Sequence, residues 1–164
     1  MDSARELPRV LRAAYFAMHR VSDAHFARHG VTADQFVLLA CLAEDDGITQ
    51  QELARRASSD PSTIRAMLVL LEGRKLVTRE RDPDDNRARL VTLSPKGRRT
   101  FERLLKTSEP IREQMLKGFS AEAARSLIVF LRRVADNMAA ESTLLPEARS
   151  FVPRRQNAKT KLSP

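Results

Sequence analysis

Asp60-Pro61-Ser62-Thr63-Ile64 predicts the start of a helix, and the residues around this start decide the fold. Asp60 can accept hydrogen bonds from the free N–H groups of a first helical turn, and proline suits the first helical position. Apolar residues then repeat at helical spacing and give the helix an inward face: Ile64, Met67, Leu68 and Leu71. Three polar residues point outward from its first turns: Ser62, Thr63 and Arg65.

A shorter helix precedes this one. Thr49-Gln50-Gln51-Glu52 is a capping-box pattern, in which the threonine hydroxyl and the glutamate side chain satisfy free backbone N–H groups. Ser58-Ser59 leaves only a few residues for the turn between the two helices. The two segments therefore predict a helix–turn–helix.

A charged hairpin follows. Residues 76–81 alternate like a strand, Asp82-Pro83-Asp84-Asp85-Asn86 predicts a turn, and residues 87–93 predict the return strand. The expected fold class is therefore mainly α with a small β-hairpin wing, a winged helix–turn–helix flanked by further helices. Such a fold binds duplex DNA more often than anything else.

These segments resemble the MarR family of bacterial transcription regulators. The resemblance lies in residues 47–54, 60–64, 71–72, 76–77, 82–88, 91–94 and 97–98, and the wing motif is its most specific part. It covers nearly the whole chain up to about Ala140. The chain departs from the family at four positions of the second helix and its end: Ala66, Val69, Leu70 and Lys75. The family often has Arg at the position of Ala66 and Asp at that of Val69, and it has Arg or Lys at that of Leu70. It commonly has Gly at the position of Lys75. Gly73 is therefore an alternative end for the helix.

The resemblance implies a homodimer whose N- and C-terminal helices interlock across a two-fold axis. It also implies a repressor that releases DNA when a small, often phenolic or carboxylated, compound binds between these helices and the DNA-binding lobe. On this basis we expect dimerisation helices in residues 1–30 and 95–140, and a DNA-binding domain in residues 31–94. Residues 141–164 are expected to form a disordered basic tail, which either adds non-specific DNA affinity or is inert.

The expected DNA contacts come from the recognition helix and the helix before it. Arg65 is the candidate for base readout, because a guanidinium can bind guanine in bidentate fashion. Ser62 and Thr63 could serve bases or phosphates, and Ser62 could serve only the helix start. Gln50 and Gln51 would face phosphates of a pseudo-palindromic double-stranded operator.

The wing supplies the remaining contacts. By the resemblance, Arg87 matches an arginine that enters the minor groove, and Asp85 orients it. Arg79 and Arg89 are either phosphate contacts or solvated strand residues.

Residues 7–29 predict a long first helix that Gly30 ends. Arg12, Tyr15 and His19 lie on one face of it, at spacings of three and four. This face could bind an anionic aromatic effector, such as a small aromatic acid or its thioester, with Arg12 as the counter-ion. It could equally be a partly exposed helix face or a dimer contact.

Helices are also expected after the wing. Ser94-Pro95 caps one helix, Pro110 breaks it near Glu109, and Ser120 caps a last helix after Gly118. Their apolar faces fit an interface with a second copy, or packing on the first helix of the same chain.

The overall charge of +8, with a pI near 10.5, favours a polyanionic partner, either nucleic acid or an anionic membrane surface. No apolar run is long enough to span a membrane, and the N-terminus lacks the apolar core of a signal peptide. We therefore expect no membrane partner and a cytoplasmic location.

The single cysteine, Cys41, excludes an internal disulfide framework and a multi-thiolate metal site. It lies in an apolar run, which favours core packing over a redox switch, although a redox-sensing regulator remains the closest variant. His25 and His29 have no carboxylate or thiolate at metal spacing, so no metal site is expected.

Other function classes have less support. No Ser/His/Asp or Cys/His pattern survives placement on helices, so we expect no enzyme and no cofactor. A winged helix used only for protein–protein contact predicts an uncharged or acidic wing tip. Arg87 and Arg89 flank this tip instead, which favours DNA.

Overall fold

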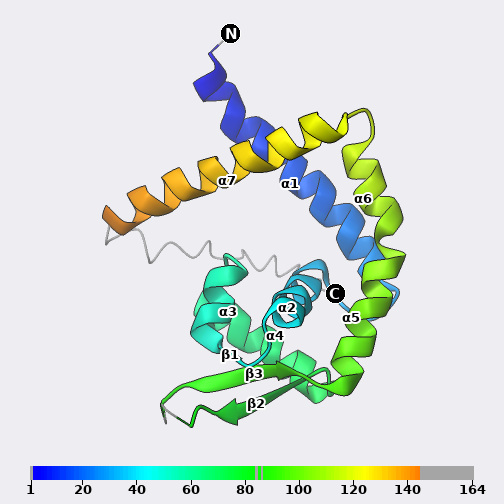
Figure 1. The fold of residues 1–164 in the computed structure, drawn as a ribbon, viewed down its shortest axis with the longest axis vertical. Coiled ribbons are helices and arrows are strands. Elements are labelled where there is room, and N and C mark those ends of the chain that lie inside the picture. The colour runs from blue at the N-terminus through cyan, green and yellow to red at the C-terminus, as the bar shows by residue number, and fades with distance from the viewer. Residues whose placement is uncertain (1, 84, 86, 145–164) are drawn as a thin grey trace, which may run out of the picture. The chain divides into compact units, whose positions relative to one another are not determined.

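The computed structural model describes residues 2–83, 85 and 87–144, and it confirms a mainly α fold with a small wing (Figure 1). The chain divides after Lys117 into two units, which are described separately. The first unit contains α1 (Ser3–Ala27), α2 (Ala33–Glu44), β1 (Ile48–Thr49), α3 (Gln50–Arg56), α4 (Pro61–Gly73), β2 (Val77–Arg81), β3 (Arg89–Leu93), α5 (Pro95–Thr107) and α6 (Glu109–Leu116). The second contains α7 (Ala121–Leu144).

The helix–turn–helix consists of α3 and α4, and both helices begin where the capping residues predict. The Thr49 hydroxyl accepts from the Glu52 backbone N–H at 3.1 Å. An Asp60 carboxylate oxygen accepts from the backbone N–H groups of Ser62 at 3.0 Å and Thr63 at 2.9 Å. These bonds satisfy donors that a helix start leaves unpaired.

The recognition helix α4 ends at Gly73, the alternative end that the departure from the family at Lys75 suggested. Lys75 follows with φ +60°, a left-handed conformation that favours glycine. The Leu76 N–H donates to the Leu71 carbonyl at 2.9 Å, and the Lys75 N–H donates to the Glu72 carbonyl at 2.8 Å. This is the Schellman arrangement of a helix end, formed here with lysine at the glycine position.

The wing is part of a three-stranded antiparallel sheet with the order β1-β3-β2. Val77 pairs with Leu93 and Arg81 with Arg89, so the two wing strands are shorter than the predicted ranges 76–81 and 87–93. The third strand, β1, pairs Ile48 with Val91 and was not predicted. Two residues are too short to show the alternation of a strand.

The core lies between α2, α3, α4, α5 and the sheet. Its fully buried side chains are Val31, Leu38, Leu39, Leu42, Leu53, Ile64, Leu68, Leu71, Leu76, Val77, Val91 and Leu104. Helix α5 approaches this core so closely that a Cβ on Gly97 would lie 1.9 Å from the Leu76 carbonyl oxygen. Only glycine fits at this contact.

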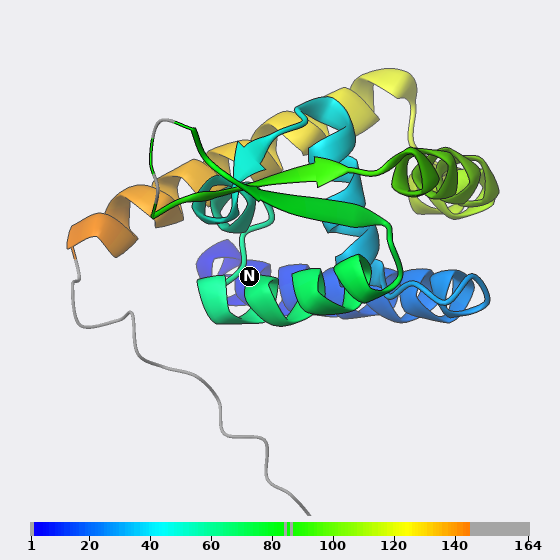
Figure 2. The ribbon, with the colours of Figure 1, turned by 90° about the horizontal axis from the view of Figure 1, so that it is seen from below.

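The flanking helices of the first unit follow the prediction with shifted ends. Helix α1 starts at Ser3 and not at Leu7, because Asp2 caps it by accepting from the Ala4 N–H at 3.2 Å. The predicted break near Glu109 is confirmed, since α5 ends at Thr107 and α6 begins at Glu109. The two helices run almost end to end (Figures 1 and 2).

Helix α7 begins after the predicted cap, where the Ser120 hydroxyl accepts from the Ala123 N–H at 3.1 Å. It continues to Leu144, so the first four residues of the predicted tail are helical. The rest of that tail, residues 145–164, lies outside the described residues. Among the helices that the structure describes, none has the length and apolarity needed to cross a membrane.

Candidate DNA interface and ligand cavity

A polar groove of about 910 Å³ lies where α3, α4 and the wing meet. It is lined by Thr49, Gln50, Gln51, Arg65, Glu72, Arg79, Asp82, Asp85, Arg87, Ala88 and Arg89. Six of the eight predicted DNA contacts are among these residues: Gln50, Gln51, Arg65, Arg79, Arg87 and Arg89. The fold thus brings together side chains that are up to 39 positions apart in the sequence (Gln50 to Arg89).

Arg79 has a partner inside this groove. Its Nε donates to Glu72 Oε2 at 3.0 Å, and a second guanidinium nitrogen donates to the same oxygen. The hydrogen bonds from Arg79 lower the pKa of Glu72. Arg79 therefore ties the first wing strand to the recognition helix, a role that neither sequence interpretation of this residue contained.

Ser62 and Thr63 do not line the groove, and both bind the helix cap. Their hydroxyls donate to the two carboxylate oxygens of Asp60, each at 2.5 Å. These hydrogen bonds hold the pKa of Asp60 well below its usual range, so the carboxylate is ionised and can only accept. Because each hydroxyl proton is donated to Asp60, both hydroxyls can only accept a hydrogen bond from a further partner.

The wing turn orders Arg87 through the backbone. Asp85 Oδ1 accepts from the Arg87 backbone N–H at 2.9 Å, so Asp85 holds the backbone from which the Arg87 side chain extends. The side chains of Arg87 and Arg89 are exposed. They are therefore accessible to an anionic partner.

The second half of the predicted capping box is wrong. The Glu52 carboxylate accepts from Arg55 at 2.6 and 2.8 Å and from Arg56 at 2.7 Å, on α3 itself. These arginines lower the pKa of Glu52 to about 2. Two guanidinium groups one turn away compete for this carboxylate with the backbone N–H of Thr49.

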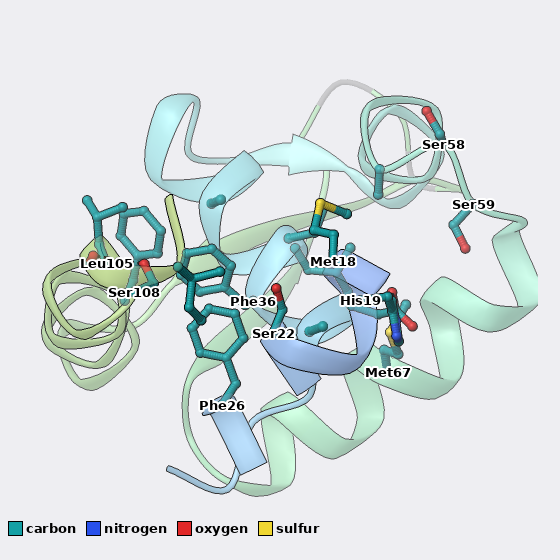
Figure 3. A pocket seen from close by; sticks show the side chains of 18 of the residues that line it. Met18, His19, Ser22, Phe26, Phe36, Ser58, Ser59, Met67, Leu105 and Ser108 are labelled. Carbon is teal, nitrogen blue, oxygen red and sulfur yellow. Dashed lines mark hydrogen bonds and ion pairs between the residues drawn. The ribbon is translucent and has the colours of Figure 1, made fainter. Parts of the chain in front are cut away.

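A second, mostly apolar cavity of about 690 Å³ lies in the first unit (Figure 3). Helices α1, α2, α4, α5 and α6 all contribute to its lining. Figure 3 shows Met18 and His19 from α1, Phe26 and Phe36 in a stacked pair, Met67 from α4, and Leu105 and Ser108 on the opposite side. Of the predicted effector contacts, Tyr15 and His19 line this cavity.

Arg12, the third predicted effector contact, is not among the lining residues. Its guanidinium carbon lies 4.7 Å from the ring centroid of Phe16, one turn along α1, in a cation–π contact. The cavity begins a turn further on, at Tyr15. Of the predicted helical face, only Tyr15 and His19 therefore line the cavity.

Arg112 of α6 supplies a cation to the cavity lining that the sequence did not suggest. Its Nη1 donates to the Ser108 hydroxyl at 2.7 Å and to the Leu105 carbonyl at 3.0 Å, and it also forms an ion pair with Glu109. The i, i+4 spacing to Ser108 was visible in the sequence. No pattern in the sequence near Arg112 indicated that its helix packs beside α1.

The cavity touches both the first helix and the recognition helix. His19 Nε2 lies 3.2 Å from Asp34 Oδ1, and Asp23 Oδ1 accepts from the Ala33 N–H at 2.9 Å, so side chains of α1 hold the start of α2. Thr63 and Met67 bring α4 into the same lining. A ligand in the cavity would therefore contact both the first helix, α1, and the recognition helix, α4.

Cys41 is partly buried and packs against the core. Burial, and then the nearby Glu44, raise the pKa of its thiol. A raised pKa lowers the thiolate fraction, and the thiolate is the reactive form. The environment therefore supports the core-packing interpretation.

Comparison with known proteins identifies related regulators. The model of the MarR family matches residues 31–88, from the start of α2 into the wing. The HTH-type transcriptional regulator TtmR of Methylorubrum extorquens is 30% identical over 141 residues, which are 83% of this chain and 71% of TtmR.

Two solved structures have a similar fold. A mutant of Escherichia coli MarR complexed with operator DNA has a TM-score of 0.73 and 25% identity, and the match covers 79% of this chain and 93% of that one. Bordetella bronchiseptica BpsR, whose DNA binding is regulated by 6-hydroxynicotinic acid, also has a TM-score of 0.73. It has 27% identity, and the match covers 79% of this chain and 98% of BpsR.

Proposed function

This chain belongs to the MarR family, and from that premise we propose that it is a homodimeric repressor that binds a pseudo-palindromic DNA operator and releases it on binding a small aromatic acid. The observation that carries the DNA-binding function is the polar groove. It places Arg65 of the recognition helix and Arg87 of the wing on one surface. A protein that reads the major groove and reaches an adjacent minor groove needs this combination.

Each side chain of the groove has a part in the proposal. Arg65 binds a guanine edge in the major groove, and Arg87 enters the minor groove. Gln50 and Gln51 bind phosphates from the start of α3, and Arg89 adds a further phosphate contact. The excess of basic residues, +8 for the chain, supplies the non-specific part of the affinity.

The dimer is proposed to form through the terminal helices, in residues 1–30 and 95–140. Large apolar side chains of α7 are exposed in the single chain, among them Leu127, Phe130 and Leu131 at 38%, 59% and 41%. Exposed apolar surface of this kind marks an interaction site. A second copy of the chain covers it in the proposed dimer.

The effector is proposed to bind in the 690 Å³ cavity. Its apolar walls suit an aromatic ring, and the Tyr15 hydroxyl can donate a hydrogen bond to a carboxylate. His19, whose Nε2 faces Asp34, can hydrogen-bond a polar substituent of the ligand through Nδ1. Arg112 takes the counter-ion role that the sequence assigned to Arg12. The effector would release DNA only if it binds more tightly to a conformation that does not fit the operator. Thr63 and Met67 offer a direct route, since both belong to α4.

The DNA-binding function is tested by selecting bound sequences from a random duplex pool. The expected product is a pseudo-palindrome whose half-sites lie about 10 bp apart, bound by two chains in sedimentation. Affinity should fall steeply between low and moderate salt. A monomer on DNA, or a flat salt response, would contradict the proposal.

The effector function is tested by thermal shift with aromatic acids, including 6-hydroxynicotinic acid, and with their coenzyme A esters. A binding compound should raise the melting temperature and weaken operator binding. Arg112→Gln and His19→Ala should abolish both effects, and Arg12→Gln is the matched control that should keep them. An effect that survives Arg112→Gln and His19→Ala places the ligand elsewhere.

A further inference from the structure

The outward face of the recognition helix is apolar beyond its first turn. Val69 is 53% exposed and Leu70 is 59% exposed, and Ala66 is exposed beside them. The opposite face carries the fully buried Ile64, Leu68 and Leu71. The three exposed residues, Ala66, Val69 and Leu70, are called the outer stripe below.

The outer stripe continues the surface that the proposed function places against DNA. Residues three and four apart share a helix face, so Ser62 leads to Ala66, and Ala66 leads to Val69 and Leu70. Arg65 lies beside this face and lines the polar groove. A helix that enters the major groove with Ser62 and Arg65 in front brings the outer stripe against the base edges behind them.

Apolar side chains find one apolar partner in the major groove. Each base edge there presents hydrogen-bond donors or acceptors, and thymine alone adds a C5 methyl group. Valine and leucine packed against the other edges would desolvate polar groups without replacing their hydrogen bonds. An exposed aliphatic face on a recognition helix therefore fits thymine.

We propose that Ala66, Val69 and Leu70 determine DNA specificity by packing against thymine methyl groups in each half-site. This inference rests on the proposed DNA-binding function. The hydroxyl of Ser62 agrees with it, because its proton is donated to Asp60 and its lone pairs can accept from the adenine amino group. An A·T pair displays both that amino group and the methyl group.

The charges around the outer stripe favour DNA over a protein partner. Arg65 borders it on the groove side, and Arg87 and Arg89 project from the wing beyond. A partner protein would have to place an acidic surface around an apolar centre. Duplex DNA provides anionic phosphates on both sides of a groove that contains methyl groups.

The test uses the duplex selected by the wild-type chain, with each thymine of one half-site replaced in turn by deoxyuridine. This replacement removes one methyl group and leaves the base pairing unchanged. At one to three positions we expect affinity to fall by roughly fourfold, the equivalent of about 0.8 kcal/mol for a buried methyl group. Deoxyuridine placed outside the bound site is the control and should have no effect.

Variants then identify the side chain that contacts each methyl group. Val69→Ala should weaken binding to the thymine duplex and should remove the deoxyuridine penalty at one position, because the two changes delete the same contact. Val69→Thr keeps the shape and one methyl group, so it should retain most of the penalty. Thr78→Ala, which alters an exposed residue of β2 outside the polar groove and the outer stripe, is the protein control.

The outcomes separate the two proposals. A selected site with sensitive thymines, whose penalty Val69→Ala or Leu70→Ala removes, supports methyl readout. A specific site where deoxyuridine has no effect, or where the penalty is the same in wild type and variants, overturns methyl readout and leaves the DNA-binding function intact. Failure to select any specific site overturns the proposed function itself.

Discussion

Arg79 and Glu72 form an ion pair, with Nε 3.0 Å from Oε2, that joins strand β2 of the wing to the last turn of the recognition helix. The Arg79 side chain is 18% exposed and that of Glu72 is 40% exposed, so water screens the pair only in part. The pair fixes the distance between two elements that are proposed to enter different DNA grooves. Because its charge is paired with Glu72, Arg79 is less available to neutralise a DNA phosphate.

This pair can be tested by a double-mutant cycle. Arg79→Gln and Glu72→Gln should each lower the free energy of unfolding, with a coupling of about 0.5–1 kcal/mol because the pair is partly exposed. Chemical denaturation of the four proteins measures the coupling. In salt titrations of DNA binding, Arg79→Gln should change the slope by less than one, whereas Arg89→Gln, which removes the proposed phosphate contact of the wing, should lower it by about one per wing. Equal slope changes would show Arg79 to be a phosphate contact.

Lys75 occupies a glycine conformation at the end of α4. We expect Lys75→Gly to raise the free energy of unfolding by about 0.5–1 kcal/mol. A left-handed backbone costs a non-glycine residue about 1–2 kcal/mol, and the greater entropy of an unfolded glycine offsets part of the gain. Lys96→Gly, in the first turn of α5, is the opposite control and should destabilise. Urea denaturation measures both. A Lys75→Gly protein that is less stable than wild type would contradict the described helix end.

Acid should destabilise the fold through the carboxylates of the helix–turn–helix. The pKa of Glu52 is lowered from 4.5 to about 2, and that of Asp60 is also lowered, so the folded state binds their protons more weakly than the unfolded state does. Their stabilisation is complete above about pH 4.5 and is lost as the pH falls from 4.5 towards 2. Melting temperatures across this range should decline, and Asp60→Asn combined with Glu52→Gln should flatten the decline. An unchanged pH profile in that double variant would contradict these pKa shifts.

Cys41 should be indifferent to mild oxidation. Its pKa is raised by burial, which keeps it in the less reactive thiol form. DNA binding of the wild type and of Cys41→Ser should respond identically to low peroxide, as measured by fluorescence anisotropy. Loss of DNA by the wild type alone would restore the redox-sensing interpretation.

The sequence predicted the parts of the fold that local chemistry decides. Caps at Thr49, Asp60, Ser94 and Ser120 marked helix starts, and each side chain accepts a hydrogen bond from its own first turn. Pro110 marked the break before α6. The short strand β1 was missed because it exists only through pairing with β3, far along the chain.

The candidate sites were predictable to different degrees. The expected DNA contacts lie on adjacent elements and a short wing, and six of the eight line one groove. The effector cavity depends on how distant helices pack. A periodic face on α1 identified Tyr15 and His19 but included Arg12, and it could not indicate Arg112 of α6. Ion pairs such as Arg79 with Glu72 also require the fold, since charge alone does not reveal a partner.

The central claim, that this chain reads DNA sequence, is tested most directly by the ratio of its affinities for the selected duplex and for a scrambled duplex of the same composition. At moderate salt the wild type should prefer the selected duplex by at least about 10³-fold. Arg65→Ala should reduce this preference by about 1–3 kcal/mol and relax it at one base position per half-site. A wild type that binds both duplexes equally would contradict the claim.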